Sequence, residues 1–266
     1  MEKNSKINQI IIIVALALAG LYLGFIFNGS KDKKTPDIQA NQEQSTVTQP
    51  TSEITLDNIK TAFNSAVIKF GDDSKKVIFL EISDPSCPFC HVAAGYNKEL
   101  SAQMSQPPQR DFKYVEDGGT YLPPVPEMKK LVESGDASYA LIYQNGHGNG
   151  EMAMLALYCA QDLNAFWKVK QLVMSNAGYD LINGSLKNDR SKAGDLANFL
   201  SSAVDKNAMK TCLESGKYED KLAADQNLAD SIGVSGTPGF FVNETKFSGA
   251  YSFKDMSSVV DTALGR

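Results

Sequence analysis

Residues 77–95 read VIFLEISDPSCPFCHVAAG, and this stretch decides the fold because it joins an apolar run to a pair of cysteines. The run VIFLEI is rich in β-branched and aromatic residues and follows the turn-like GDDSKK of residues 71–76, so it predicts a buried strand. Pro88 suits the first turn of a helix, where its missing N–H costs no hydrogen bond. Cys87 is therefore expected at a strand-to-helix junction, with Cys90 one turn farther along a helix that ends near residue 106.

The motif C-P-F-C-H is compatible with three kinds of site. A structural zinc site needs four ligands, usually in two close pairs, and the remaining two cysteines and two histidines form no second pair. Attachment of a c-type haem through Cys87, Cys90 and His91 matches the pattern, although Pro88 and the preceding buried strand argue against it. The favoured interpretation is a thiol–disulfide redox pair, because a helix N-terminus stabilises a thiolate. His91 is then expected to face solvent or to pack on a neighbour.

A second motif lies much later in the chain. GVSGTPGFFVN at residues 233–243 places Thr237 and Pro238 just before a short apolar strand. An X-Pro bond adopts the cis form far more readily than other peptide bonds, and a cis proline at a strand entrance accompanies C-x-x-C in thioredoxin-like folds.

Together, the strand–CPFC–helix unit, the later GTP and the long helical stretch between them resemble the DsbA family of extracytoplasmic thiol–disulfide oxidoreductases. Residues 151–167 and 212–243 resemble the helical insert and return strand of membrane-tethered bacterial members, and the resemblance covers most of residues 77–266. It implies an α/β thioredoxin-like fold. A helical insertion, at about residues 150–232, is expected between the second core strand, residues 138–144, and the third.

The resemblance also implies roles for particular residues. Cys87 would be the nucleophile and Cys90 the resolving, more buried thiol, with Pro88 and Phe89 forming the active-site loop between them. Pro238 would be the cis proline beside which an extended substrate segment pairs, and Thr237 would contact the cysteine pair and tune its potential.

Glu81 lies six residues before Cys87, which is the spacing of the buried acid in that family. Its strand neighbours are apolar on both faces, so we expect Glu81 to be buried rather than solvent-facing. Burial would make its ionisation costly, so Glu81 is expected to exchange a proton with Cys90. Asp84 and Ser86 are expected to shape the turn and cap the helix.

Cys159 and Cys212 are either two inert buried thiols or a structural disulfide. In an oxidising compartment, free thiols beside a redox pair would mispair, so a disulfide between them is predicted.

Between the two parts of the core, residues 107–150 contain an insertion with a short helix near 125–134. His147, in its glycine-rich loop, is expected to be a solvated turn residue.

Residues 10–27 are an unbroken run of apolar residues and glycine, about the minimum length for a helix that spans a bilayer. The run continues past any small-x-small site, which favours an uncleaved anchor over a signal peptide. The expected organisation is a cytoplasmic stub and transmembrane anchor at 1–28, a flexible linker at 29–54 and the DsbA-like domain at 55–266. The domain is placed on the extracytoplasmic side, because that is where disulfides persist.

The composition of the 266 residues is that of an ordinary globular protein, 42% hydrophobic with a net charge of -5, and argues against nucleic acid as a partner. The expected partners are exported proteins that contain cysteine, a membrane oxidase that restores the disulfide, and the membrane itself. No cofactor or metal is expected. A reductase or isomerase of the same fold, a c-type haem electron-transfer protein and a metal-binding module remain alternatives.

Overall fold

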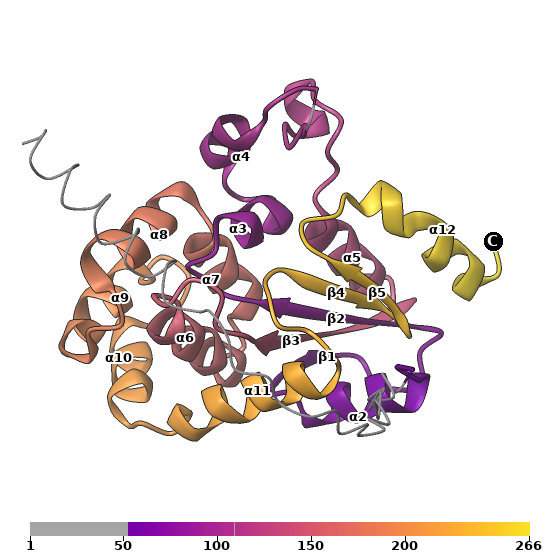
Figure 1. Cartoon of the computed structure of the whole chain (residues 1–266). Helices are drawn as coiled ribbons and strands as arrows, with labels where there is room; N and C mark the ends of the chain where they lie inside the picture. The colour runs from indigo at the N-terminus through magenta and orange to yellow at the C-terminus, as the bar shows by residue number, and fades with distance from the viewer. Residues whose placement is uncertain (1–52, 109) are drawn as a thin grey trace, which may run out of the picture. The chain divides into compact units, whose positions relative to one another are not determined.

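A five-stranded mixed sheet forms the centre of the domain (Figure 1). The computed structural model describes residues 53–108 and 110–266. The strands lie in the order β1-β3-β2-β4-β5, and only β2 and β3 run parallel. Their bounds are β1 Ile68–Phe70, β2 Val77–Ser83, β3 Ala137–Tyr143, β4 Gly239–Val242 and β5 Thr245–Ser248. The strands expected at 77–82, 138–144 and 240–242 are thus present, and the short β1 is an addition.

The central strand β2 is buried along its whole length, because helices cover both faces of the sheet. Ile78, Leu80 and Ile82 share a core cluster with residues of helix α2 (Leu56–Ser65) and the segment around α11 (Glu219–Ser231). The alternate residues Val77 and Phe79 belong to the larger cluster on the opposite face. Strand β2 is therefore a doubly covered strand, and its C-terminal end carries the cysteine motif into a protected position.

The chain after β2 forms two short helices rather than the single helix expected to reach residue 106. Helix α3 (Pro88–Ala94) ends at Gly95, which has φ 81°, and helix α4 (Lys98–Met104) follows. A Cβ at Gly95 would lie 2.9 Å from Pro123, so this position needs glycine for space as well as for its backbone conformation. The left-handed residue turns α4 away from the direction of α3.

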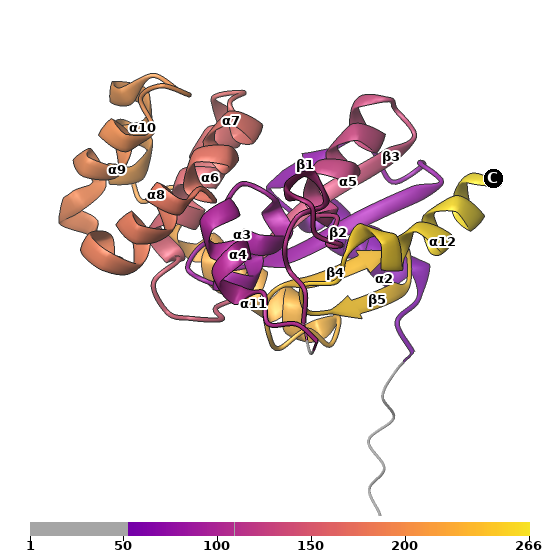
Figure 2. The same cartoon turned by 90° about the horizontal axis from the view of Figure 1, so that it is seen from above.

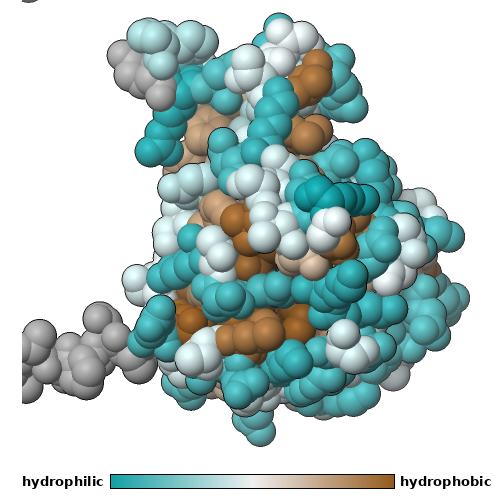
Figure 3. Space-filling view, turned by 90° about the vertical axis from the view of Figure 1, so that its right-hand side faces the viewer, coloured by the Kyte–Doolittle hydropathy of each residue, from teal (hydrophilic) through white to brown (hydrophobic). Residues whose placement is uncertain are grey.

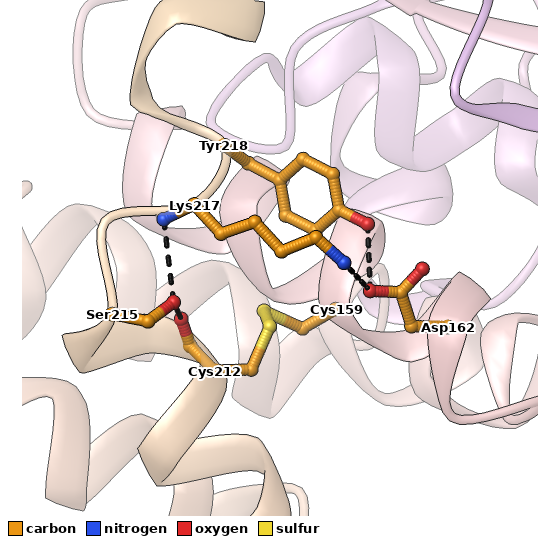
Figure 4. The surroundings of a disulfide bond; sticks show 6 residues. All are labelled: Cys159, Asp162, Cys212, Ser215, Lys217 and Tyr218. Atoms are coloured by element: carbon orange, nitrogen blue, oxygen red, sulfur yellow. Dashed lines mark hydrogen bonds and ion pairs between the residues drawn. A yellow bond between two sulfur atoms is a disulfide. The ribbon is translucent and has the colours of Figure 1, made fainter.

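A group of helices lies between β3 and β4, as expected, and Figure 2 shows most of it at one end of the sheet. Disulfide Cys159–Cys212 joins helix α6 (Glu151–Asp162) to helix α10 (Lys206–Glu214), and this is the pairing expected from the sequence (Figure 4). Beside it, Asp162 accepts hydrogen bonds from the Lys217 Nζ (2.6 Å) and the Tyr218 hydroxyl (2.7 Å). The helices are α6 Glu151–Asp162, α7 Phe166–Val173, α8 Asn176–Asp180, a π-helical turn Leu181–Leu186, a 3-10 turn Arg190–Lys192, α9 Ala193–Phe199, α10 Lys206–Glu214 and α11.

The insertion at residues 105–123, of which 105–108 and 110–123 are described, precedes helix α5 (Pro124–Glu133), the short helix expected near 125–134. The insertion includes a 3-10 turn, Val115–Asp117, and its buried aromatic residues form a small apolar cluster with Val92 of α3. In Figure 1, α4 and this insertion lie at the top of the molecule, above α3. The β4–β5 hairpin and the closing helix α12 (Phe253–Leu264) also match the expectation.

The expected stub, anchor and nearly all of the linker lie outside the described residues. Within residues 53–108 and 110–266, no helix is long and apolar enough to cross a bilayer.

Candidate redox site

The cysteine motif lies where β2 passes into α3. The Cys87 N–H donates to the Asp84 carbonyl at 3.0 Å, and the Cys87 carbonyl accepts from the N–H of Cys90 (3.1 Å) and of His91 (3.2 Å). Cys87 is thus the residue at the helix N-cap, as the sequence predicts, and Pro88 begins the helix. Both cysteines are free thiols and both are buried.

The two thiols differ strongly in acidity. The pKa of Cys87 is lowered to about 6, chiefly by the hydrogen bond from the Cys90 thiol, with smaller help from Thr237 and from the charge of His147, while burial opposes the shift. Burial raises the pKa of Cys90 well above its ordinary value. At neutral pH Cys87 is therefore mostly a thiolate, the attacking and leaving species of disulfide exchange, and Cys90 stays protonated.

The second motif lies directly beside the first. The Thr237–Pro238 peptide bond is cis, and the Thr237 carbonyl oxygen lies 3.4 Å from the Cys87 Sγ, although 150 residues of sequence separate them. Phe89, between the cysteines, packs edge-on against Phe112 of the insertion with 5.8 Å between the ring centroids. The structure therefore places Thr237 and the cis Pro238, expected beside the cysteine pair, next to Cys87.

Asp84 organises the turn before the cysteines. Its buried carboxylate accepts four hydrogen bonds, through Oδ1 from the N–H and hydroxyl of Ser86 (both 2.7 Å) and through Oδ2 from the N–H of Gly146 (2.9 Å) and of His147 (2.8 Å). A buried charge is tolerated when it is hydrogen-bonded this fully. Asp84 and Ser86 shape the turn as expected, but the expectation that they cap the helix is wrong, since α3 has no side-chain cap.

The glycine-rich loop at residues 145–150 packs against this turn because its glycines leave room. A Cβ at Gly150 would lie 1.8 Å from the Asp84 Oδ1, and one at Gly146 would lie 2.2 Å from the Thr237 Oγ1. The His147 side chain is exposed at the rim of the site, as expected for a turn residue. The loop thereby contacts both segments that carry the expected site residues.

Glu81 is buried, as expected, but it is not alone. Its Oε2 lies 2.6 Å from the Lys170 Nζ and accepts a hydrogen bond of 2.5 Å from the Tyr139 hydroxyl, which in turn lies 2.7 Å from Lys170. Burial lowers the pKa of Lys170, and the charge of Glu81 opposes that shift. The carboxylate is thus held by a cation and a hydroxyl, and proton exchange between Glu81 and Cys90 stays a prediction.

Sequence reasoning missed both partners of Glu81. Tyr139 lies on β3, and Lys170 lies on α7, where Phe166, Lys170 and Val173 are spaced as one buried helix face. A lysine at an apolar position of that helix face is the sequence signal that could have predicted a buried charge there.

His91 lies in the core, which excludes the solvent-facing option and fits the packing one. Its Nε2 lies 2.8 Å from the Pro85 carbonyl oxygen and its Nδ1 lies 3.0 Å from that of Met174. Burial lowers its pKa to about 4, so the ring is neutral at physiological pH. An imidazole enclosed by backbone in this way is not free to ligate haem iron. Within the described residues, no cluster of three or more histidine, cysteine or acidic side chains could hold a metal ion.

A family model described as thioredoxin matches residues 126–262. The chain belongs to the thioredoxin family. The fold is that of DsbA proteins: the structure of Wolbachia pipientis alpha-DsbA1 superposes with a TM-score of 0.53 at 19% identity, covering 74% of this chain and 90% of that one. The DsbA of Chlamydia trachomatis superposes with a TM-score of 0.51 at 17% identity, covering 73% of this chain and 89% of that one. The resemblance to DsbA proteins stated from the motifs is thereby confirmed for family and fold.

Two curated relatives extend the comparison. A Rickettsia felis protein named as a protein-disulfide oxidoreductase is 23% identical over 195 residues, which are 73% of this thioredoxin-family chain and 59% of the relative. The Na(+)/H(+) antiporter NhaA 3 of Salinispora tropica is 24% identical over 195 residues, which are 24% of its length. This chain therefore spans less than two thirds of either relative.

Proposed function

We propose that this protein is a thiol–disulfide oxidoreductase that introduces or exchanges disulfides in exported proteins through the Cys87–Cys90 pair. The observation that carries the proposal is the difference between the two thiols, one with a pKa lowered to about 6 and the other raised by burial. This difference gives the pair a defined nucleophile and a defined resolving thiol. The family, the DsbA-like fold and the Rickettsia felis relative support the same activity.

The proposed reaction begins with the oxidised Cys87–Cys90 disulfide. A substrate thiolate attacks the Cys87 sulfur, the disulfide breaks, and Cys90 leaves with the electron pair and takes up a proton. A second substrate thiolate then attacks the substrate sulfur of the mixed disulfide, and Cys87 leaves as a thiolate. The substrate has lost two electrons and gained a disulfide, and the protein is the two-electron-reduced dithiol. A membrane oxidase is proposed to take these electrons and restore the disulfide.

Thr237 and Pro238 are proposed to bind the substrate segment next to its cysteine, because the Thr237 carbonyl already contacts the Cys87 Sγ. Glu81 is proposed to help the proton balance of Cys90, and its pairing with Lys170 makes Lys170 a participant in that role. Pro88 and Phe89 complete the loop between the cysteines.

The proposed location is the extracytoplasmic side of a membrane, with residues 55–266 as the catalytic domain, residues 29–54 as a linker and residues 10–27 as the anchor. The Cys159–Cys212 disulfide supports this proposal, because such bonds persist in oxidising compartments. Fusion of the protein to a reporter active on only one side of the membrane tests it.

The central test is to titrate the redox pair against a glutathione buffer and to follow the oxidation of a reduced substrate protein. We expect an oxidising pair, and we expect Cys87→Ser to abolish substrate oxidation. A strongly reducing potential would instead favour the reductase or isomerase alternative. Full activity of Cys87→Ser would exclude the mechanism.

A further inference from the structure

We propose that the insertion at residues 105–123 and the turn between β5 and α12 form the two sides of a groove for an extended substrate segment. The substrate segment has acidic and bulky apolar side chains close to its cysteine. This inference rests on the proposed function and names the substrate class of the same site.

Three surface depressions form the groove, and they share residues from one to the next. The first lies along the loop that carries the cis proline and ends on Ser248 and Gly249. The second, with a volume of about 700 Å³, begins on the same two residues and ends on Arg110 and Phe112. The third, of about 540 Å³, shares Arg110 and Phe112 and ends on Phe89, between the two cysteines. The path therefore begins beside the partner of the Cys87 thiol and returns to the cysteine loop.

The groove offers aromatic surface to a ligand at the half-buried Phe89 and the exposed Tyr251, whereas the rings of Phe112 and Tyr121 are buried. The Phe112 ring contacts those of Phe89 and Tyr121 edge-on at 5.8 Å and 5.5 Å between centroids, which holds the insertion over the cysteine loop. Tyr251, on the other side, is 44% exposed, one of the few large hydrophobic side chains that are exposed in the described chain. Figure 3 shows hydrophobic patches set among hydrophilic residues both on the uppermost part of this face and below it. Exposed aromatic surface of this kind is typical of a binding site.

The charges of the groove are unbalanced toward positive. Its acidic side chains are already engaged, because Asp111 accepts from the N–H (3.2 Å) and hydroxyl (2.9 Å) of Thr120 and Asp255 accepts from the Ser252 N–H at 3.1 Å. Three cations, Arg110, Lys246 and Lys254, line the groove against these two carboxylates, and no carboxylate within the described residues pairs with any of the three. A lining with more cations than carboxylates, in a protein of net charge -5, favours an acidic ligand.

The backbone beside the groove suits an extended polypeptide. Strand β5 is the outer strand of the sheet and, among the residues that the structure describes, pairs only with β4, so its other edge has no backbone partner there. Ser248, the last residue of β5, lines both the first and the second depression. An extended segment can add to such an edge while its alternate side chains enter the groove.

The test compares three reduced peptides that differ only in the residues flanking one pair of cysteines: aspartate with phenylalanine, serine with phenylalanine, and lysine with phenylalanine. The oxidised full-length protein is expected to oxidise the acidic peptide with a kcat/KM about three- to tenfold above that of the basic peptide, since each exposed charge pair changes affinity by about two- to fivefold. Arg110→Glu with Lys254→Glu should abolish or reverse this preference. Lys168→Glu, the same charge reversal at an exposed lysine of α7 outside the groove, should keep it.

Dithiothreitol serves as a substrate too small to use the groove. All variants should react with it at the wild-type rate, which also shows that they are folded. The groove proposal would be refuted, and the proposed function would stand, if the protein reacted rapidly with dithiothreitol but showed equal kcat/KM for the three peptides. An unchanged preference in the double variant would have the same meaning. Failure to react with dithiothreitol as well as the peptides would overturn both. Loss of the acidic preference at high salt is expected, because the contacts are exposed.

Discussion

The ionisation of Cys87 determines how the reduction potential of the redox pair depends on pH. Its pKa is lowered from 9.0 to about 6, while that of Cys90 is raised by burial. Below pH 6, reduction of the disulfide takes up two protons, and between pH 6 and the pKa of Cys90 it takes up one. Each proton changes the equilibrium constant tenfold per pH unit, which is about 30 mV for a two-electron couple. The potential should therefore fall by about 60 mV per pH unit below pH 6 and by about 30 mV above it.

The direction of the shift in reduction potential depends on whether the lowered pKa of Cys87 favours the reduced or the oxidised protein. A lowered pKa stabilises the reduced protein once pH exceeds that pKa, and the stabilisation is lost as pH falls through about 6. At pH 7, a thiol with pKa about 6 favours the reduced form by about tenfold over a thiol with pKa 9.0, which is about 1.4 kcal/mol or about 30 mV. The pair is thus expected to become a stronger oxidant, relative to an unperturbed pair, as pH rises from 5 to 8.

The assay is equilibration with glutathione buffers from pH 4.5 to 8.5, followed by acid quenching and mass analysis of alkylated peptides. Thiolate absorbance of the reduced protein gives the pKa independently. Cys90→Ala should raise the pKa of Cys87, because the hydrogen bond from Cys90 is the largest cause of its lowering. A constant slope of about 60 mV per pH unit across this range would refute the reasoning, as would a Cys90→Ala variant whose Cys87 titrates like the wild type.

Three further changes test the surroundings of the site. Lys170→Met leaves the Glu81 carboxylate buried without its cation and should lower the free energy of unfolding in urea by about 3–5 kcal/mol. Adding Glu81→Gln should recover much of this loss, and an unchanged stability of the single variant would contradict the pairing. Gly150→Ala places a Cβ 1.8 Å from the Asp84 Oδ1 and should slow substrate oxidation, whereas Gly184→Ala, with open space around it, should not. Replacing both cysteines of the structural disulfide by alanine should lower the free energy of unfolding by about 2–4 kcal/mol and leave the potential of the active pair unchanged, and a shifted potential would show that the disulfide acts on the site.

The parts of the fold that the sequence predicted are those with strong local patterns. The apolar run of β2, the proline that begins α3 and the turn of the β4–β5 hairpin each specify their own conformation. The single helix expected to reach residue 106 was wrong for a local reason as well, since Gly95 interrupts it with φ 81°. Strand β1 has only three residues and depends on its pairing with β3, so the sequence contains no periodic pattern that would predict it.

The parts of the site that were missed depend on contacts between distant segments. Glu81 was placed correctly by its spacing from Cys87, but its partner Lys170 lies 89 residues away. Likewise, the turn at Asp84 was recognised from the sequence. The two backbone N–H groups that donate hydrogen bonds to the Asp84 Oδ2, however, come from a loop 62 and 63 residues later. Burial of His91 depends on the end of α7, where Met174 provides the carbonyl oxygen that its Nδ1 contacts. Sequence spacing near the cysteines contains no information about such partners.

These distant contacts indicate that the helical insertion is part of the redox site rather than a separate cap. The buried polar groups next to the cysteine motif have contacts outside the strand–helix unit: Glu81 with Lys170 of α7 and His91 with Met174 just after it. A buried polar group without a partner costs about 1–3 kcal/mol, and an unpaired buried charge costs more. Loss of these helices would therefore leave Glu81 without its cation and the His91 Nδ1 without the Met174 carbonyl, next to the site where Cys87 must be held. The same contacts mean that any movement of α7 relative to the sheet changes the charge and packing behind the cysteine pair.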